Sequence, residues 1–447
     1  MPKRNILLLL ATCLACLAAW AAREQGGHSR RFGEVMAAIE RRHLEPANPQ
    51  VMFDAAVDAA VARLDEHSAY LRGDGRAELE TALDQQFGGV GLELALDRAV
   101  DRPVVVSPVF ESPAWRAGIA SGDVITAIDG NDTTGKPLRK VVERLRGKLG
   151  DPVTLRLAVA RAEPVATRDP GALPPEVLIR EVVLVREEVQ IESVLGDHRR
   201  PDGTWEWHLE DEPGLAIVRI TSFGERTADE FASACRELAA DNGLQGLVID
   251  LRGNPGGLLQ AAVDVCDVLL EEGVIVSTRG RRESGTAVVS EKRATAGRLL
   301  ADVPIAVLVD GLSSSSAEIV AACLQDVGRA VVVGSRTFGK GTVQTILPLS
   351  DNAGLLKITT AEYLRPSREP IHRHPGAGED DAWGVRPDAG FEVTPTAEAS
   401  ERLREWRRRR DACLPPGTAA ASGWPVQPPA REVDAVLARA LEITAAE

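Results

Sequence analysis

Four consecutive serines, Ser313 to Ser316, stand where a nucleophile would be well placed. The apolar run 304–309 before them is typical of a buried strand, and an apolar helical pattern follows them as far as Gln325. A serine at the first turn of a helix lies beside free backbone amides and the positive end of the helix dipole, which favour a developing negative charge. Four serines are also typical of ordinary helix N-capping, which the run by itself favours.

A lysine between two glycines follows the next predicted strand, residues 330–333. Lys340 stands in the sequence Gly339-Lys340-Gly341. Burial disfavours the charged form of an amine, so a desolvated Lys340 could act as a base, whereas a lysine in a surface turn could not. Gln344 follows four residues later. On a strand beginning at Lys340 both side chains would face the same way, and the amide could hold the amine by a hydrogen bond.

A glycine-rich loop, Arg252-Gly253-Asn254-Pro255-Gly256-Gly257, follows the predicted strand 246–251. We expect all three loops at the carboxyl ends of buried strands, where open α/β sheets bind ligands. The glycine amides could donate to an oxyanion, although a tight helix-entry turn has the same composition. Because no histidine occurs between His208 and His372, a Ser-His-Asp triad is not available in this span, and the residues permit the Ser-Lys variant of nucleophilic catalysis.

Composition defines the class of the protein. The 447 residues carry 52 Lys and Arg against 66 Asp and Glu, a net charge of −14, and 44% of them are hydrophobic. These values exclude intrinsically disordered, fibrous and polytopic membrane proteins. An acidic chain without clustered basic and aromatic residues is also a poor partner for nucleic acid. We interpret the basic run Arg407 to Arg410 as a solvated helix face rather than a binding site.

The chain is expected to be an α/β multidomain protein. Its first residues combine Lys3-Arg4 with an apolar run from Ile6 to Ala22, which predicts an export signal, either cleaved or retained as a membrane anchor; a buried N-terminal helix is the other interpretation. The remainder would then work outside the cytoplasm, in a periplasm or secreted. The predicted segments are a signal peptide or anchor (1–25), an N-terminal helical region (26–85), a β-rich module (86–162), a linker (163–185), an α/β core (186–396) and a C-terminal helical tail (397–447).

The cysteines and histidines give no sign of a metal site. The first two of the six cysteines lie within the predicted signal, and Cys235, Cys266 and Cys323 fall in apolar helical patterns, where buried free thiols are the ordinary state. His372 and His374 are closely spaced, but they stand in a polar loop. We therefore expect no cofactor.

At these residues the chain resembles the C-terminal processing peptidases, which are secreted or membrane-anchored serine proteases with a Ser-Lys dyad. The resemblance covers about residues 64 to 390. It rests on the serine and lysine loops together with the motifs Leu64-Asp65-Glu66-His67-Ser68-Ala69-Tyr70-Leu71, Phe87-Gly88-Gly89-Val90-Gly91, Ile220-Thr221-Ser222-Phe223, Asp250 to Gly257, Thr359-Thr360-Ala361-Glu362-Tyr363 and Gly384-Val385-Arg386-Pro387-Asp388.

The resemblance implies roles for residues of the two loops. The family's nucleophile is the third residue of a Ser-Ala-Ser-Ala-Ser-Glu-Ile type motif, which here reads Ser313 to Ile319 and assigns Ser315. Lys340 would be the base, and Gln344 would support it.

Further roles follow from the same resemblance. The oxyanion donors would be the amide of Ser316 and one from Gly256 or Gly257. An aspartate implicated in the family aligns with Asp326, which we interpret as structural. The sequence departs from the family where alanines become Ser314 and Ser316, and these hydroxyls could compete with the nucleophile.

The β-rich module resembles a PDZ domain. In such domains a Gly-Val-Gly-Leu type loop binds a free C-terminal carboxylate through backbone amides while the peptide adds a strand to the sheet. Here the loop would be Gly89-Val90-Gly91-Leu92. The resemblance also implies a crotonase-like fold for the protease core.

Together these features predict a serine endopeptidase that cleaves exported proteins near their C-termini through an acyl-enzyme on Ser315. Its partners would be proteins or peptides with exposed C-termini, and its N-terminal segment could associate with a membrane. One alternative is a catalytically inactive scaffold that binds peptides through the PDZ-like module. Another is a Ser-Lys hydrolase of cell-wall amides, which a module for binding chain ends disfavours.

Overall fold

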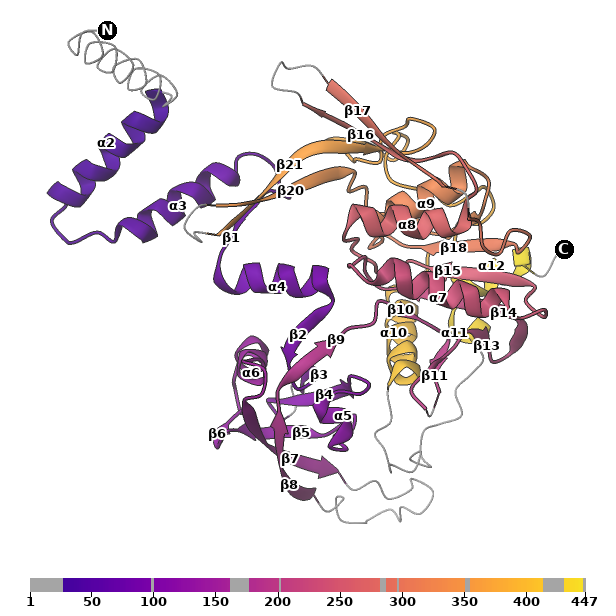
Figure 1. The fold of residues 1–447 in the computed structure, drawn as a ribbon, viewed down its shortest axis with the longest axis horizontal. Helices are drawn as coiled ribbons and strands as arrows, with labels where there is room; N and C mark the ends of the chain where they lie inside the picture. The colour runs from indigo at the N-terminus through magenta and orange to yellow at the C-terminus, as the bar shows by residue number, and fades with distance from the viewer. Residues whose placement is uncertain are drawn as a thin grey trace, which may run out of the picture. The chain divides into compact units, whose positions relative to one another are not determined.

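The computed structural model describes residues 27–97, 100–160, 177–200, 202–281, 287–295, 297–349, 354–412 and 430–444 (Figure 1). The predicted export signal lies outside these residues. The chain divides into two compact units, one made of residues 1–72 and 344–359 and the other of residues 73–343 and 360–447. None of the described helices has both the length and the hydrophobicity that a membrane crossing needs.

The first unit is helical at its start, as predicted, but also contains strands. A turn at Asp65, whose Oδ1 accepts the amides of His67 and Ser68 at 2.8 Å, leads into a short strand that pairs antiparallel with Leu355 to Lys357. The elements of this unit are α2 (Gly27–Arg42), α3 (Pro49–Val61), β1 (Ala69–Leu71), most of β20 (Thr342–Pro348) and the first half of β21 (Leu355–Leu364).

The predicted β-rich module is an antiparallel sheet in the order β3-β4-β5-β7-β8, with β6 on β5. Its core joins alternate strand residues, such as Ile125, Leu155 and Leu157, to Val141 and Leu145 of α6. The elements are β3 (Leu92–Asp97), β4 (Arg102–Pro108), α5 (Pro113–Arg116), β5 (Val124–Ile128), β6 (Asn131–Asp132), α6 (Leu138–Leu145), β7 (Pro152–Ala160) and β8 (Val177–Val185).

The second half of the predicted linker 163–185 is instead the last strand of this sheet. β8 pairs with β7 without a break, from Pro152 opposite Val185 to Ala160 opposite Val177. The β-branched residues of the segment favour a strand, and Leu184 is buried in the module's core. The module therefore extends beyond residue 162. The antiparallel strands β2 (Gln86–Gly89) and β9 (Glu187–Gln190) pair with each other where the chain enters and leaves the module.

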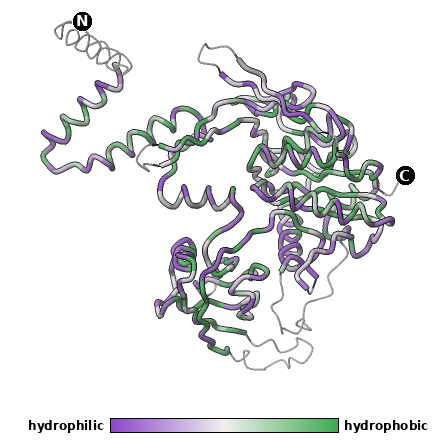
Figure 2. Tube along the Cα trace, in the orientation of Figure 1, coloured by the Kyte–Doolittle hydropathy of each residue, from purple (hydrophilic) through white to green (hydrophobic). Residues whose placement is uncertain are grey.

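The predicted α/β core is built on four parallel strands in the order β14-β15-β18-β19. The predicted strands and helices between residues 246 and 333 are all present. Strands β15, β18 and β19 are short and almost entirely apolar, as expected for parallel strands covered on both faces (Figure 2). Strand β14 is longer and also contains Glu212 and Arg219. The main elements are β14 (Glu212–Ile220), α7 (Thr227–Ala239), β15 (Gly246–Asp250), α8 (Leu259–Leu269), β18 (Ile305–Val309), α9 (Ser316–Asp326) and β19 (Val331–Gly334).

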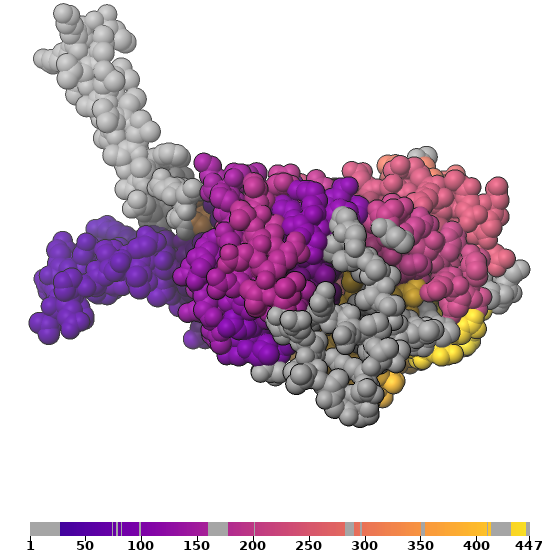
Figure 3. All heavy atoms as spheres, turned by 90° about the horizontal axis from the view of Figure 1, so that it is seen from below, coloured from indigo at the N-terminus to yellow at the C-terminus, as the bar shows by residue number. Residues whose placement is uncertain are grey.

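Neighbouring residues of the strands face opposite layers of helices. Leu247 and Ile249 of β15 pack with α7, α8 and α9, whereas Val248 between them packs with the C-terminal helices. These helices, coloured orange to yellow in Figure 3, are α10 (Ala397–Asp411), α11 (Ala430–Val433) and α12 (Ala435–Thr444). The predicted helical tail is thus part of the folded core.

The basic run of α10 is not the solvated face that the sequence suggested. The side chains of Arg407 and Arg410 are 10% and 9% exposed. They are buried because Trp406, beside them, packs against the sheet, and because Arg410 forms an ion pair with the buried Asp197.

Two of the remaining strands, β10 and β13, pair antiparallel with β14 of the core sheet, and the other elements lie around the core. β16 pairs antiparallel with β17 and with the second half of β21. Cys235, Cys266 and Cys323 are buried free thiols, as predicted. The other elements are α4 (Gly73–Asp84), β10 (Val194–Leu195), β11 (His198–Arg199), β12 (Trp205–Glu206), β13 (His208–Leu209), β16 (Val274–Arg281) and β17 (Ala287–Arg293).

Candidate active site

Ser315 occupies a sharp turn between β18 and α9. Its φ of 56° is a conformation that non-glycine residues rarely adopt, and α9 begins at the next residue. The Asp310 carboxylate holds the start of the turn by accepting the amides of Leu312 and Ser313 at 3.0 Å. Ser315 is 6% exposed. A strained turn from strand to helix that carries a serine is a recurrent way of positioning a nucleophile.

A single carboxylate joins the serine turn to the lysine loop. Oε2 of Glu318 accepts the amide of Ser315 at 2.9 Å and the amide of Lys340 at 2.8 Å. Oε1 accepts the amide of Gly339 at 2.7 Å and the hydroxyl of Thr337 at 2.5 Å. Because both amides bind one oxygen atom, the backbones of Ser315 and Lys340 lie side by side.

Glu318 is held in place by its burial and by the hydrogen bonds that it accepts. Burial raises the pKa of its carboxyl, while the four hydrogen bonds that it accepts act in the opposite direction. The side chain is fully buried. A carboxylate that accepts four donors holds both loops in one arrangement, since any movement would leave a buried donor without an acceptor.

The lysine loop is also held from its other side. Gly339 O accepts the amide of Arg373 at 2.8 Å, and Gly341 O accepts the amide of Tyr363 at 2.6 Å. A Cβ atom on Gly341 would lie 2.1 Å from the backbone nitrogen of His372, so only glycine fits there. Lys340 itself is partly buried and precedes β20, which begins at Thr342. The expected strand therefore begins two residues later than Lys340, and Lys340 lies in the loop before it.

The glycine-rich loop lies directly against the serine turn. Asn254 is fully buried and its backbone carbonyl accepts the amide of Ser314 at 2.9 Å. A Cβ atom on Gly256 would lie 2.7 Å from Cβ of Ser315. The amide of Gly256 donates to Asn254 Oδ1 at 2.8 Å. Of the two glycines predicted as oxyanion donors, Gly256 thus has its amide already engaged.

The other predicted donors, Gly257 and Ser316, lie together. Ser316 Oγ donates to Gly257 O at 3.0 Å, and Ser316 is the first residue of α9. The bridge between Phe223 and Gly257 uses the amide of Leu258 and the carbonyl of Gly256, so it leaves the Gly257 amide out. The engaged, fully buried hydroxyl of Ser316 is poorly placed to compete as a nucleophile.

Gln344 lies in β20, within the other compact unit. Its Nε2 donates to Thr359 Oγ1 at 3.4 Å, and that hydroxyl donates to Asp65 Oδ1 at 3.1 Å. The amide of Thr359 donates to Ser68 Oγ at 3.1 Å. The motifs 64–71 and 359–363 therefore meet beside Gln344. The role of Gln344 toward Lys340 stays a prediction.

Asp326 is the last residue of α9 and binds Arg365. Both of its oxygens accept Arg365 Nε at 3.0 Å, and Oδ2 accepts the amide of Ser367 at 2.9 Å. Burial would raise the pKa of Asp326, but these hydrogen bonds outweigh it and hold the pKa below its ordinary value. The contacts are those of a structural ion pair.

The predicted carboxylate-binding loop of the β-rich module precedes its edge strand β3. Gly91 has a φ of 75°, and a Cβ atom there would lie 2.2 Å from Cβ of Ser112. The carbonyls of Val90 and Gly91 accept the amides of Ala114 and Val109. The loop is thus fixed through its carbonyls, and within the described ranges β3 pairs only with β4.

Sequence reasoning missed Glu318 and Asn254 as residues that position the site. Glu318 had a signal, because a serine followed three residues later by glutamate is a capping-box pattern. Asn254 had none, since its contacts depend on how distant loops fold together. No group of three His, Cys, Asp or Glu arranged to hold a metal occurs in the described ranges.

The chain was compared with known proteins. The model of peptidase family S41 matches residues 214–390, and a PDZ domain model matches residues 104–159. A carboxy-terminal-processing protease of Bartonella bacilliformis is 33% identical over 75% of this chain and 71% of its own length. The chain belongs to peptidase family S41. A carboxyl-terminal-processing protease of Synechocystis is likewise 33% identical, over 71% of this chain and 68% of its own length.

As an S41 peptidase, the protein is a serine-type hydrolase of peptide bonds with a PDZ domain and a mixed α/β core. Among solved structures, the photosystem II D1 C-terminal processing protease is 26% identical, with a TM-score of 0.45 over 88% of this chain and 97% of that one. The relatives named here are carboxy-terminal processing proteases, and none of them supports an inactive scaffold.

Proposed function

We propose that this S41 peptidase cleaves exported polypeptides near their C-termini, with Ser315 as nucleophile and Lys340 as base. The observation that carries the assignment is the Glu318 carboxylate, one oxygen of which binds the amides of both residues. This oxygen supports a dyad because it holds two residues 25 positions apart in the sequence next to each other.

In the proposed mechanism, Ser315 Oγ attacks the carbonyl carbon of the scissile bond and its proton passes to the neutral amine of Lys340. The oxyanion would be bound by the amides of Ser316 and Gly257, with the dipole of α9 adding to the stabilisation. Protonated Lys340 gives its proton to the leaving amine. Water then hydrolyses the acyl-enzyme, with Lys340 again as base, and Gln344 would hold the lysine side chain in place.

The PDZ domain would select the substrate by its chain end. Amides of the loop Gly89 to Leu92 would bind the C-terminal carboxylate, and the peptide would pair with the free edge of β3. The positive φ of Gly91 and its tight contact with Ser112 support a loop of fixed shape. This arrangement delivers to the dyad a segment upstream of an exposed C-terminus.

The N-terminal sequence supports an extracytoplasmic location. Lys3-Arg4 followed by the apolar run from Ile6 to Ala22 is the pattern of an export signal, cleaved or retained as an anchor. The substrates would then be proteins of the periplasm, the cell envelope or the medium.

Replacing the dyad residues tests the assignment. We expect Ser315→Ala, Lys340→Ala and Lys340→Arg each to lower kcat/KM by at least about 10³-fold on an unstructured peptide with an apolar C-terminus. The circular dichroism spectrum should be unchanged. Amidating the peptide's C-terminus should raise KM in the wild type. Normal cleavage by Ser315→Ala would reject the nucleophile, and normal cleavage by both Lys340 variants would mean that another base operates.

A further inference from the structure

A cavity of about 730 Å³ lies at the carboxyl ends of the parallel strands, against α10. Its wall includes Asp250 at the end of β15 and Val309 at the end of β18. It also includes Gly253 and Leu312, which precede the proposed oxyanion glycine and nucleophile in their loops. A cavity of this size accommodates a few residues of peptide. The cavity therefore borders the loops that carry the proposed chemistry.

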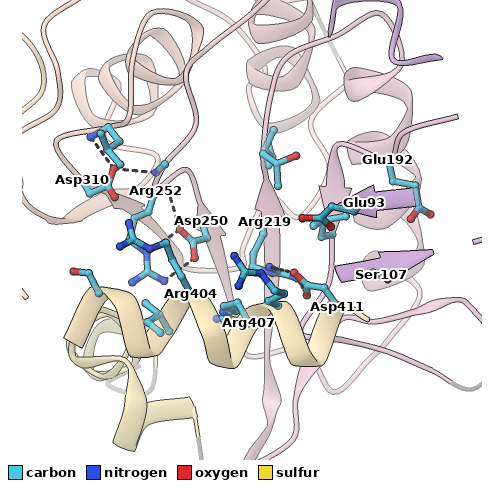
Figure 4. Close-up of a pocket in the computed structure, with 18 of the residues that line it drawn as sticks. Glu93, Ser107, Glu192, Arg219, Asp250, Arg252, Asp310, Arg404, Arg407 and Asp411 are labelled. Atoms are coloured by element: carbon cyan, nitrogen blue, oxygen red, sulfur yellow. Dashed lines mark hydrogen bonds and ion pairs between the residues drawn. The ribbon is translucent and has the colours of Figure 1, made fainter. Parts of the chain in front are cut away.

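Arginines from β11, β14, α10 and the loop after β15 line this cavity, and Figure 4 labels four of them. Most of the lining arginines are paired with carboxylates, as two of them illustrate. Arg219 of β14 binds Asp411, with Nη1 3.0 Å from Oδ2. Arg252 binds Asp250 through both Nε and Nη2, at 2.9 and 2.6 Å. In both pairs, two nitrogen atoms of a buried guanidinium bind one carboxylate.

Arg407 of α10 departs from that pattern. It is buried, yet among the residues that the structure describes its Nε and Nη2 have no hydrogen-bond partner. Its contact with a carboxylate is a long one, 3.5 Å from Nη1 to Asp197 Oδ1. Burial and the positive charge of Arg219 lower the pKa of Arg407 to about 10. The Nε–Nη2 edge that binds a carboxylate in Arg252 is thus left unsatisfied in Arg407.

Arg404 lies almost one turn earlier on the same face of α10 and lines the same cavity. It is exposed, and the part of the chain that the structure describes gives it no ion pair. The acidic residues that also line the cavity are largely engaged. Glu192 binds Arg199, and Asp310 accepts amides of its own loop. Glu93 remains, and burial raises its pKa, which favours its neutral form.

We propose that this cavity binds a carboxylate group through Arg404 and Arg407, and that the carboxylate is an Asp or Glu side chain of the polypeptide substrate. Two positive groups without full counter-charges favour an anion. The apolar residues that also line the cavity, such as Phe110, Ile191 and Leu195, favour a carboxylate carried on a peptide rather than a small, fully hydrated ion. Entry of the carboxylate would give the Nε–Nη2 edge of Arg407 the acceptor that it lacks, with a small rotation of the guanidinium. This inference rests on the proposed function, because it names a specificity of the same site.

Paired peptides test the proposal in the full-length protein. All peptides share one apolar C-terminus, so that the contribution of the PDZ domain cancels, and each pair differs by Glu or Gln at one position within about five residues of the scissile bond. At one or two positions we expect the Glu peptide to be cleaved with about tenfold higher kcat/KM, the effect of one charge-assisted hydrogen bond. Equal rates for every pair would overturn the proposed source of the carboxylate.

Substitutions on α10 test whether the preference for Glu peptides arises in this cavity. Arg404→Gln should reduce the preference for Glu to less than about twofold. Arg402→Gln is the matched control, because Arg402 is an exposed residue of the same helix that does not line the cavity. Arg407→Lys, which retains the charge facing Asp197 but not the two-nitrogen edge, should also weaken the preference. An unchanged preference in both Arg404→Gln and Arg407→Lys would overturn the site.

A binding measurement separates this proposal from the proposed function. Glutarate is titrated calorimetrically into Ser315→Ala protein, with and without Arg404→Gln. Binding that Arg404→Gln abolishes, together with equal cleavage of all peptide pairs, would retain the carboxylate site but make a free carboxylate its occupant. Absence of glutarate binding together with absence of any Glu preference overturns the site. Failure of the wild type to cleave any peptide contradicts the proposed function alone, and the titration then decides the carboxylate site.

Discussion

Glu318 illustrates how one fully buried side chain can organise the proposed catalytic site. Its four hydrogen bonds join two loops that are distant in the sequence, and they fix the backbones of the proposed nucleophile and the proposed base together. We therefore assign Glu318 the role of a positioning residue. Its position three residues after Ser315 allows it to complete the first turn of α9 at the same time.

Glu318→Gln should separate this positioning role from chemistry. A glutamine has one acceptor oxygen, so its NH₂ group would face either two amides or one amide and the hydroxyl of Thr337. The resulting shift of the loops should lower kcat/KM about 10²-fold, because small displacements of reacting groups have effects of that size. Peptide cleavage and thermal unfolding are measured together. Glu398→Gln, at an exposed site in the first turn of α10, is the control. Unchanged kcat/KM in Glu318→Gln would contradict the role.

The candidate serine and lysine could be named from the sequence, whereas most of the contacts that position them could not. A serine run and a glycine-flanked lysine each follow a buried strand, and the family resemblance singled out Ser315 within the run. Asn254 and the chain of contacts from Gln344 through Thr359 to Asp65 escape notice, because they join segments tens to hundreds of residues apart. No local pattern encodes such pairings.

At the scale of elements, the serine turn and the glycine loop form one rigid unit. Gly256 is in a left-handed conformation, φ 94°, and a Cβ atom there would lie 2.7 Å from Ser314 O and from Ser315 Cβ. Gly253 of the same loop is also left-handed, φ 71°, but a Cβ atom there would meet nothing within 4 Å. The two glycines therefore share a backbone requirement and differ in what surrounds them.

Alanine at these two positions should have different consequences. Both Gly253→Ala and Gly256→Ala carry the strain of a non-glycine residue at positive φ, about 1 kcal/mol of unfolding free energy. Gly256→Ala must in addition displace Ser315, so it should lower kcat/KM by about 10²-fold, while Gly253→Ala should retain most of the activity. Urea unfolding and peptide cleavage measure the two effects. Equal losses of activity in the two variants would show that strain, not the contact with Ser315, decides the outcome.

The parallel strands β15, β18 and β19 and the ends of helices α8 and α9 were predicted within one or two residues, because continuous apolar runs bounded by glycine loops have few other structures available. The fourth parallel strand, β14, was not predicted. The strand β8 was missed. Its sequence follows a segment rich in proline and glutamate, and those residues predicted a linker that extended too far. The antiparallel strands β16, β17 and β21 were also missed, since they mix charged with apolar residues and depend on distant partners.

At the scale of the whole molecule, buried ion pairs connect elements that are distant in the chain. Asp326 at the end of α9 binds Arg365, and Arg219 of β14 binds Asp411 of α10. Arg252 binds Asp434, next to α12, by two hydrogen bonds at 2.8 and 2.7 Å. The stability of the fold should therefore depend on the charge of these carboxylates.

The Asp326–Arg365 pair predicts how stability changes with pH. The pKa of Asp326 is held below 3.8 in the folded protein, so between the two values the unfolded chain binds more protons. Its contribution is present above about pH 4 and is lost as the pH falls through the lowered pKa. Asp326→Asn should cost about 2 kcal/mol at pH 7 by urea unfolding. The difference from the wild type should narrow below about pH 4. A constant difference down to pH values of about 2 would contradict the prediction.

The pairing of β2 with β9 brings the two ends of the PDZ domain together. Phe87 lies opposite Val189, so the polypeptide enters the PDZ domain and leaves it at adjacent points. An inserted domain whose two ends lie close together can be accommodated without changing the structure of the domain that contains it. A different binding domain could therefore replace the segment between residues 86 and 190. If the replacement keeps β2 and β9 as the junction, the protease core should still fold, and the enzyme should bind different substrates.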